Sequence, residues 1–298
     1  MADDAGLRMP EALMARAREL ISKQQEQGWV APTARDAATV VMVANHPDGI
    51  HIYLQRRVRT MAFAAGMYVF PGGATEQQDS AMADALLAAN PERQLDASWL
   101  VTGPASVGTD TLTARCAAVR ETEEETSYDL GDPRDLTYIA HWVTPEVEQR
   151  RFDTRFYAQV VHAPDEVIEN SGESDAERWV SPAEALAEYG GGRMAMLPPT
   201  VAVLSEFAAA AERGLDAQAA IDAVAITPTL PLMPAPIADP TAPDGMRWVL
   251  IDVRTGEEVT LLPSAPAGSE SGGIHTSAVD RSTQVHQRTS PDSPGTPR

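Results

Sequence analysis

Two short motifs constrain this chain more than any other feature: Phe-Pro-Gly-Gly at residues 70–73 and Arg-Glu-Thr-Glu-Glu-Glu at residues 120–125. Read as a helix, the second motif places Glu121, Glu124 and Glu125 at positions i, i+3 and i+4 of one face. Three carboxylates so close repel one another, which costs free energy unless a cation lies near them. Mg²⁺ prefers carboxylate oxygens, so the spacing indicates a divalent-cation site.

An acidic run by itself is more often a solvated helix face than a metal site. The upstream motif favours the metal site here, because Gly72 and Gly73 allow a close backbone approach to a ligand. Together the motifs resemble the Nudix box of the Nudix hydrolases. That box reads Gly, five residues, Glu, seven residues, Arg-Glu, an aliphatic residue, any residue, Glu-Glu, any residue, Gly.

The resemblance to the box includes three substitutions and one change of spacing. Asp79 stands where the box has its first Glu, Thr122 takes the aliphatic position, and Ser127 replaces the last Gly. Forty residues, 80–119, separate Asp79 from the Arg-Glu pair, where the family has seven. The positions that match are Gly73, Arg120, Glu121, Glu124 and Glu125.

The insertion inside the box is similar to the branch of the family that includes the peroxisomal coenzyme A diphosphatase. Residues 66–73 resemble the glycine and Phe-Pro-Gly-Gly approach of that branch, and residues 151–156 resemble its Arg-Phe-Asp-Thr strand. A coenzyme A signature that precedes the box in this branch is matched at Arg57 and Gly66. Its second Arg is replaced by Ala62, which leaves the substrate open.

The resemblance implies an α/β (α+β) fold. We expect a Nudix-type α/β/α sandwich with a mixed sheet, an insertion inside the Nudix box and extra C-terminal helices. It also implies that Glu121, Glu124 and Glu125, with the Gly73 carbonyl, hold Mg²⁺ or Mn²⁺. The cation would lower the pKa of the attacking water and neutralise phosphate charge.

Three acids are candidates for the general base. Glu121, oriented by Arg120, is one candidate. Many Nudix enzymes also carry a loop acid before a Trp-Val strand, and the first choice for it here is Glu173, followed by Glu177. Either loop acid alone is more often a surface carboxylate.

Substrate contacts are expected from residues just before the box. Arg57 and Arg59 belong to a short basic cluster in an acidic chain, and guanidinium groups pair well with phosphate. Solvated arginines paired with surface acids are an equal alternative. Phe70, in the Phe-Pro-Gly-Gly motif, is the expected apolar contact of the substrate.

Three functions fit these observations. The first is hydrolysis of the diphosphate linkage of coenzyme A or an acyl-coenzyme A. The second is hydrolysis of another nucleoside diphosphate derivative, such as NADH, ADP-ribose or a dinucleotide. The third is a non-catalytic Nudix ligand-binding module, which is less favoured because such modules usually lose acids of the box. The intact acids at 121, 124 and 125 favour an enzyme.

The composition of the chain limits the classes of partner that it can bind. A net charge of −20 argues against general binding of nucleic acid or an anionic membrane, which needs clustered positive charge. We expect a small-molecule substrate. A homodimer is compatible with the sequence but not indicated by it.

The chain has one cysteine, Cys116, so it forms no internal disulfide, and it has no run of 18 apolar residues. We expect a cytoplasmic protein.

Patterns along the chain predict four segments. These are an N-terminal helical lead-in at 1–34, a Nudix domain at 35–226 with an insertion at about 80–112, a proline-rich strap and hairpin at 227–262, and a disordered tail at 263–298. Apolar periodicity predicts the elements within them. The expected helices are 10–27, 80–89, 113–125, 182 onward, 199–211 and 216–224; the expected strands are 37–44, 50–55, 136–143 and 155–162, with a hairpin over 247–262.

Overall fold

The computed structural model describes residues 15, 18–19, 30–61, 63–89, 109–167, 172–225, 230–242, 245–260 and 275–277. Most of the expected helix at 10–27, residues 90–108 of the insertion expected at about 80–112 and nearly all of the expected tail at 263–298 lie outside the described residues. Among the described helices, none is long and apolar enough to cross a membrane.

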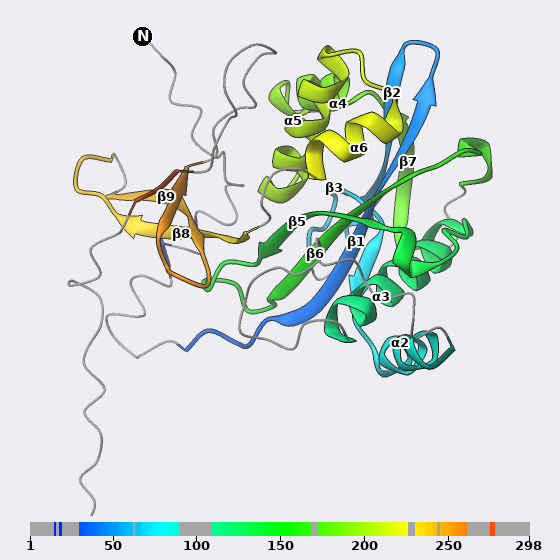
Figure 1. Ribbon diagram of the computed structural model, residues 1–298. Helices are drawn as coiled ribbons and strands as arrows, with labels where there is room; N and C mark the ends of the chain where they lie inside the picture. The colour runs from blue at the N-terminus through cyan, green and yellow to red at the C-terminus, as the bar shows by residue number, and fades with distance from the viewer. Residues whose placement is uncertain are drawn as a thin grey trace, which may run out of the picture.

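A mixed sheet runs through the molecule (Figure 1). Its strand order is β11-β10-β9-β8-β5-β6-β1-β2-β3, and β4 and β7 pair with β1 and β2. The strand β1 pairs in parallel with β6 and antiparallel with β2 and β4, which makes it central. The bounds are β1 Arg35–His46, β2 Gly49–Arg57, β3 Tyr68–Val69, β4 Gly72–Ala74, β5 Thr137–Val143, β6 Phe152–Val160, β7 Ser174–Val180, β8 Pro231–Ala238, β9 Met246–Asp252, β10 Glu258–Thr260 and β11 His275–Ser277.

Helices cover both faces of the sheet. Two of them, α2 (Gln77–Ala89) and α3 (Thr109–Thr126), lie on one face. The other face carries α4 (Pro182–Gly190), α5 (Pro198–Glu212) and α6 (Ala217–Ala225). Alternate residues of β1 serve the two layers: Val40 and Met42 pack against α3, and Val41 and Val43 belong to the core beneath the other three helices. Burial on both faces explains why this strand is a continuous apolar run.

The predicted elements inside the domain are confirmed, with ends shifted by a few residues. The expected strand 37–44 is the buried part of β1, and the expected helix 80–89 is the C-terminal part of α2. The helix expected from 182 onward is α4, and Ser181 caps it: its side chain accepts a hydrogen bond from the Glu184 N–H, and Pro182 follows at the first helical position. The predicted α/β/α arrangement with a mixed sheet is confirmed.

The proline-rich segment differs from the expected strap. Its strand β8 is extended, but it pairs with β9 along its length and with β5 at His141 and Trp142. Pro234 and Pro236 are two residues apart, so their missing N–H groups face one edge of β8 and leave the ladder with β9 intact. Leu232 is buried in the core shared with α5 and α6, and the segment is therefore part of the sheet.

The helix α3 ends without a glycine. Ser127 has a φ of 55° and its N–H donates to the Glu123 carbonyl at 2.8 Å, which is the left-handed ending that glycine usually provides. Ser127 therefore forms the turn that the last glycine of the box would form, at the cost of conformational strain.

Candidate active site

Arg120 on α3 joins the two halves of the split motif. Its Nε and Nη2 donate to the two carboxylate oxygens of Asp79 at 2.8 and 3.0 Å, and Nη2 also donates to the Ala74 carbonyl at 3.2 Å. Its Nη1 donates to Glu121 at 2.9 Å and to Glu124 at 3.1 Å. The hydrogen bonds that Arg120 donates to Asp79, which is only 2% exposed, raise the pKa of Arg120 further above its usual range. Asp79 and the Ala74 carbonyl therefore hold the Arg120 guanidinium in place, and the guanidinium in turn orients Glu121 and Glu124.

Glu121 lies directly against β4. A Cβ atom added to Gly73 would come within 2.4 Å of the Glu121 carboxylate, so a side chain at this position would displace that carboxylate. Burial raises the pKa of Glu121, and the hydrogen bond and charge of Arg120 oppose that shift. The glycine of the motif therefore lets this carboxylate lie directly against the backbone of β4.

Glu125 is 4% exposed, which makes it the most buried of the acids of α3 whose exposure the structure describes. Its Oε2 accepts hydrogen bonds from Gln55 Nε2 at 2.6 Å and from the Gly72 N–H at 3.0 Å. Burial raises its pKa to about 7, partly opposed by these two donors and increased by the charge of Glu121. The two hydrogen bonds offset only part of the cost of burying this negative charge. A cation beside the carboxylate would stabilise it further.

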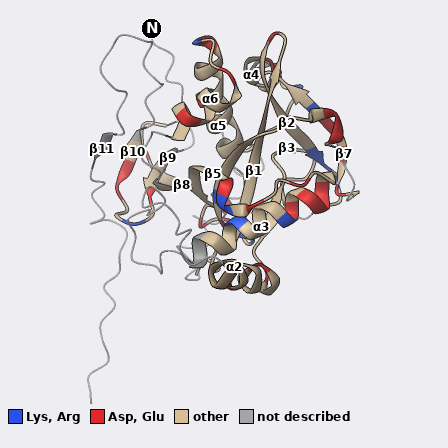
Figure 2. Cartoon of the chain, turned by 45° about the vertical axis from the view of Figure 1, so that its right-hand side comes forward, with Lys and Arg blue, Asp and Glu red and all other residues tan. Residues whose placement is uncertain are grey.

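Glu124 and Glu173 are more accessible. The Glu124 side chain is 56% exposed and touches Arg120 on its inner side, and Glu173 is 49% exposed beside Arg57, with 3.5 Å between Nη2 and Oε2. Figure 2 shows the acidic C-terminal turns of α3 in red at the edge of the sheet. Glu124 thus faces solvent next to Glu121, where a cation can enter.

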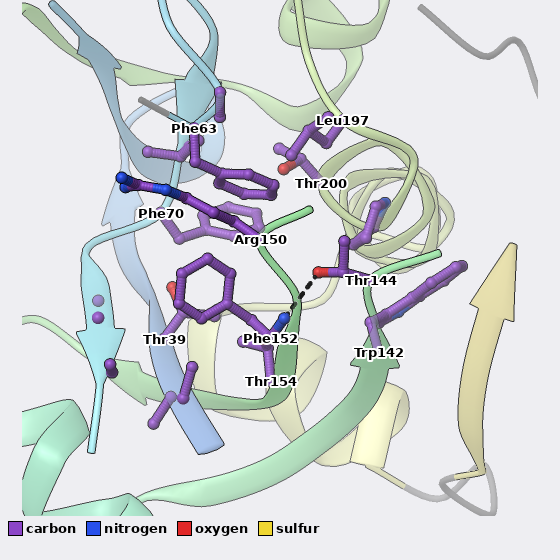
Figure 3. A pocket seen from close by; sticks show the side chains of 18 of the residues that line it. Thr39, Phe63, Phe70, Trp142, Thr144, Arg150, Phe152, Thr154, Leu197 and Thr200 are labelled. Carbon is purple, nitrogen blue, oxygen red and sulfur yellow. Dashed lines mark hydrogen bonds between the residues drawn. The ribbon is translucent and has the colours of Figure 1, made fainter. Parts of the chain in front are cut away.

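A cavity of about 410 Å³ lies over these groups. We call Gly72, Gly73, Glu121 and Glu125 its acidic wall. Its apolar wall consists of Phe63, Trp142, Phe152, Leu197, Pro198 and Pro199. In Figure 3, Trp142 and Leu197 lie across the cavity from the cyan strand β4, and the Arg150 side chain extends toward the rings of Phe63 and Phe70.

The structure brings most of the predicted residues to this cavity. Glu121, Glu125, Gly73, Arg57, Phe70 and Glu173 line it. Arg59 does not, because it lies exposed in the turn after β2. Glu177 is also absent from the lining and accepts a hydrogen bond from the Tyr53 hydroxyl at 3.0 Å. Glu173 is therefore better placed than Glu177 to meet a ligand.

Several residues of the site were not predicted from the sequence. Gln55 was assigned only to a strand, and its amide holds Glu125. The apolar wall comes from the loop after β2, from β5, from β6 and from the start of α5, which no local motif connects. The one available signal was the Leu-Pro-Pro-Thr run at 197–200, which places fixed apolar surface at a helix start.

The donor set fits a hard divalent cation. Three carboxylates share one helix end, two of them with a pKa raised by burial, and one guanidinium, Arg120, donates to two of them. Oxygen donors of this kind suit Mg²⁺ or Mn²⁺ and offer neither the thiolate nor the imidazole that softer ions select.

Comparisons with known proteins agree with this geometry. A family model described as the NUDIX domain matches residues 98–198, which include α3 and end at the start of α5. A curated relative from Caenorhabditis elegans, “Putative nudix hydrolase 7”, is 23% identical over 182 residues. The match covers 58% of this chain, and the chain spans 60% of the length of that relative.

One solved structure shares the fold, and a second is a more distant likeness. The crystal structure of a NUDIX hydrolase from Alicyclobacillus acidocaldarius is 25% identical, with a TM-score of 0.52, and the match covers 65% of this chain and 97% of that one. The NUDIX domain of NrtR from Shewanella oneidensis, solved with ADP ribose, is 12% identical, with a TM-score of 0.39, and the match covers 70% and 100%. The second likeness is too distant to carry an argument about ligands. The homology to Nudix hydrolases supports an enzyme.

Proposed function

We propose, taking the chain as a member of the Nudix hydrolase superfamily, that it catalyses the Mg²⁺-dependent hydrolysis of a diphosphate linkage in a nucleoside diphosphate derivative. The observation that carries the proposal is the clasp between Asp79 and Arg120. It holds Glu121 and Glu124 beside a cavity whose floor contains the buried Glu125. A solvated acidic helix face would need neither the clasp nor the cavity.

The residues that would hold the cation are Glu121, Glu124, Glu125 and the Gly73 carbonyl. A bound Mg²⁺ (or Mn²⁺) would neutralise phosphate charge and lower the pKa of a coordinated water. Arg120 keeps the glutamates in position, and Gln55 fixes the buried oxygen of Glu125. Water then attacks one phosphorus atom, the bridging P–O bond breaks, and the other phosphate leaves with its substituent.

The general base is one of two carboxylates. Glu121 is half-buried against Gly73, and Glu173 lines the cavity beside Arg57. Arg57 is also placed to meet a phosphate of the substrate, because it lines the same cavity. We propose both acids as candidates, and kcat–pH profiles of Glu121→Gln and Glu173→Gln separate them. The variant that loses the acidic limb of the profile has lost the base.

The preferred substrate is coenzyme A or an acyl-coenzyme A. The split box supports this branch, and the apolar wall offers surface for a thiol- or acyl-bearing arm. Arg35, Arg57 and Arg150 line the same cavity and can pair with its phosphates. Ala62, in place of the second Arg of the coenzyme A signature, favours the alternative of NADH, ADP-ribose or a dinucleotide. The negative net charge fits a small-molecule substrate, and a cytoplasmic location stays a prediction.

The third possibility, a ligand-binding module without catalysis, has less support. Arg120, Glu121, Glu124 and Glu125 are all present, and the first three form one hydrogen-bonded group. Binding alone would not require that group. Retained ligand binding without any Mg²⁺-dependent turnover would establish the module.

A product assay tests the proposal. Coenzyme A, NADH and ADP-ribose are incubated with Mg²⁺ and with wild type, Glu124→Gln or Glu123→Gln, an exposed neighbour on the same helix turn. We expect wild type and Glu123→Gln to cleave coenzyme A at its diphosphate, and Glu124→Gln to lose most of the activity. Cleavage of NADH or ADP-ribose alone would correct the substrate. Equal activity in all three proteins would refute the assigned site.

A further inference from the structure

The hairpin between β1 and β2 carries a cluster unrelated to the cavity. The cluster consists of His46, Asp48 and His51, with Pro47 and Asp48 in the turn. The register pairs His46 with Gly49 and Ala44 with His51, so both imidazoles project from the same side of the ribbon. Gly49 has no side chain, which leaves room for the two rings to meet. Figure 1 shows this hairpin projecting past the helices.

The three side chains converge on one point. The imidazole rings stack with 4.1 Å between centroids, His46 Nδ1 contacts Asp48 Oδ1, and His51 Nε2 lies 3.0 Å from the same oxygen. One ligand atom from each residue lies within 4.8 Å of the others. Small side-chain adjustments therefore bring all three atoms to the roughly 2.0–2.2 Å distances of a Zn²⁺ ion.

His51 lacks the hydrogen bond that its burial calls for. Its side chain is 14% exposed, and Nε2 is closed to solvent and forms no hydrogen bond among the described residues. The nearby Asp48 oxygen lies at 3.0 Å without the alignment of a hydrogen bond. A buried ring nitrogen facing a carboxylate costs free energy, which a cation between the two atoms would recover.

We propose that His46, Asp48 and His51 form a second metal site, selective for Zn²⁺ or a similar borderline transition-metal ion. Two imidazoles and one carboxylate are the donor set that such ions prefer, whereas Mg²⁺ prefers oxygen donors alone. The chemistry of this site thus differs from that of the acidic wall. His46 and Asp48 are exposed, at 53% and 67%, so water or an added ligand completes the coordination.

The two sites are separated along β1. Thr39 pairs with Gly72 at the acidic wall, and His46 lies seven residues further along the strand. At about 3.3 Å per residue, roughly 23 Å separate them. An ion at the hairpin therefore contacts neither the glutamates nor the substrate cavity, and its main effect is to hold the two strand ends together.

Equilibrium dialysis against Zn²⁺ in saturating Mg²⁺ tests the proposal. We expect one Zn²⁺ per chain in the wild type, loss of that ion in His46→Ala, and affinity weaker by at least about tenfold in Asp48→Asn. His162→Ala, an exposed histidine outside the cluster, is the matched control and keeps the ion. Circular dichroism of the metal-free variants verifies that each is folded.

Co²⁺ supplies a readout independent of stoichiometry. Co²⁺ in this site would give visible absorption bands in wild type and in Glu124→Gln, and these bands would disappear in His51→Ala. Zn²⁺ binding that is unchanged in His46→Ala, or that disappears in Glu124→Gln, would assign the ion to another site and overturn the proposal. No Zn²⁺ bound by the wild type would also overturn it.

Discussion

The two walls of the cavity are held in place by different forces. The acidic wall rests on α3 and β4, and hydrogen bonds of 2.6–3.0 Å fix each of its carboxylates. The apolar wall draws on the loop after β2, on β5, on β6 and on the start of α5, and packing holds it. Charge-assisted hydrogen bonds depend on a few atoms, whereas packing depends on many small contacts.

This difference teaches where substitutions will have large and small effects. A single atom exchanged on the acidic wall removes a donor or an acceptor that nothing else replaces. A side chain shortened on the apolar wall removes only part of the contact surface. The predictions below test that contrast, beginning with the largest expected effect.

Glu121→Gln is expected to lower kcat by roughly 10²- to 10⁴-fold, because the neutral amide can neither bind a cation well nor accept a proton. Steady-state hydrolysis with Mg²⁺ measures the change. Glu123→Gln, exposed on the same helix, serves as the control and should keep its rate. A loss below tenfold would remove Glu121 from the site.

Asp79→Ala leaves Arg120 without its bidentate partner. Breaking a buried ion pair on one side costs on the order of 3 kcal/mol of unfolding free energy. We also expect a kcat lower by about 10-fold or more, because the glutamates lose their support. Urea unfolding and kinetics measure the two effects, and Asp84→Ala, exposed on the same helix, should show neither.

Asp79→Glu distinguishes the role of the charge from that of its position. The Nudix box has Glu here, so this variant should recover most of the activity. A variant as impaired as Asp79→Ala would show that the shorter side chain is required by the spacing of α2 and α3.

Glu125→Gln should change how stability depends on pH. Burial raises the pKa of Glu125 to about 7 from an ordinary 4.5, so the folded protein favours the neutral carboxyl. Its contribution to stability is present below pH 4.5 and is lost as the pH rises to 7, by up to about 3 kcal/mol. The amide stays neutral, so the metal-free variant is expected to be more stable than wild type at pH 8 and similar at pH 4.

Urea unfolding in a chelator, at several pH values between 4 and 8, measures this difference. The comparison with wild type cancels the other titrating groups. Parallel curves for the two proteins would contradict the assignment of Glu125 as a destabilising buried acid.

Phe63→Ala tests the apolar wall. The ring packs edge-to-face on Phe152 with 5.3 Å between centroids, and its removal takes away part of one side of the cavity. We expect KM to rise by about tenfold with kcat nearly unchanged, since this contact binds ground state and transition state alike. Met82→Ala, 52% exposed on α2, is the control. A fall in kcat alone would place Phe63 nearer the reaction centre.

Ser127→Gly should give the smallest effect. Glycine adopts the positive φ at the end of α3 without strain, so we expect a gain of about 0.5–1 kcal/mol in unfolding free energy. Thermal unfolding measures it, and activity should stay the same. A destabilised variant would show that the hydroxyl of Ser127 is needed.

The contrast between the walls also explains what the sequence revealed. Glu121, Glu124 and Glu125 are neighbours in the sequence, so helical spacing alone places them together and the prediction needed no tertiary information. Trp142 and Leu197 meet only through the folded sheet. Arg59 was predicted from its charge alone and does not line the cavity. A basic cluster in the sequence does not indicate which of its side chains face a binding site.

Gln55 shows a second limit. Its position on β2 was predicted, but its role depends on the C-terminal end of α3 lying within hydrogen-bond distance of that strand, which periodicity does not report. Similarly, the prolines of β8 suggested a strap, because a pattern of residues does not say which strand edge is left unpaired. The helices and strands could be predicted from the sequence, but the tertiary contacts between them could not.

The clasp between Asp79 and Arg120 has a consequence for how the chain tolerates change. It fastens α2 to α3 and so closes the base of the segment between Ala89 and Thr109. Each doubling of a closed loop costs only about 0.6 kcal/mol of chain entropy, so longer segments could be accepted there. The same position is a natural place to divide the gene, with two separately expressed fragments reassociating through the clasp into a working enzyme.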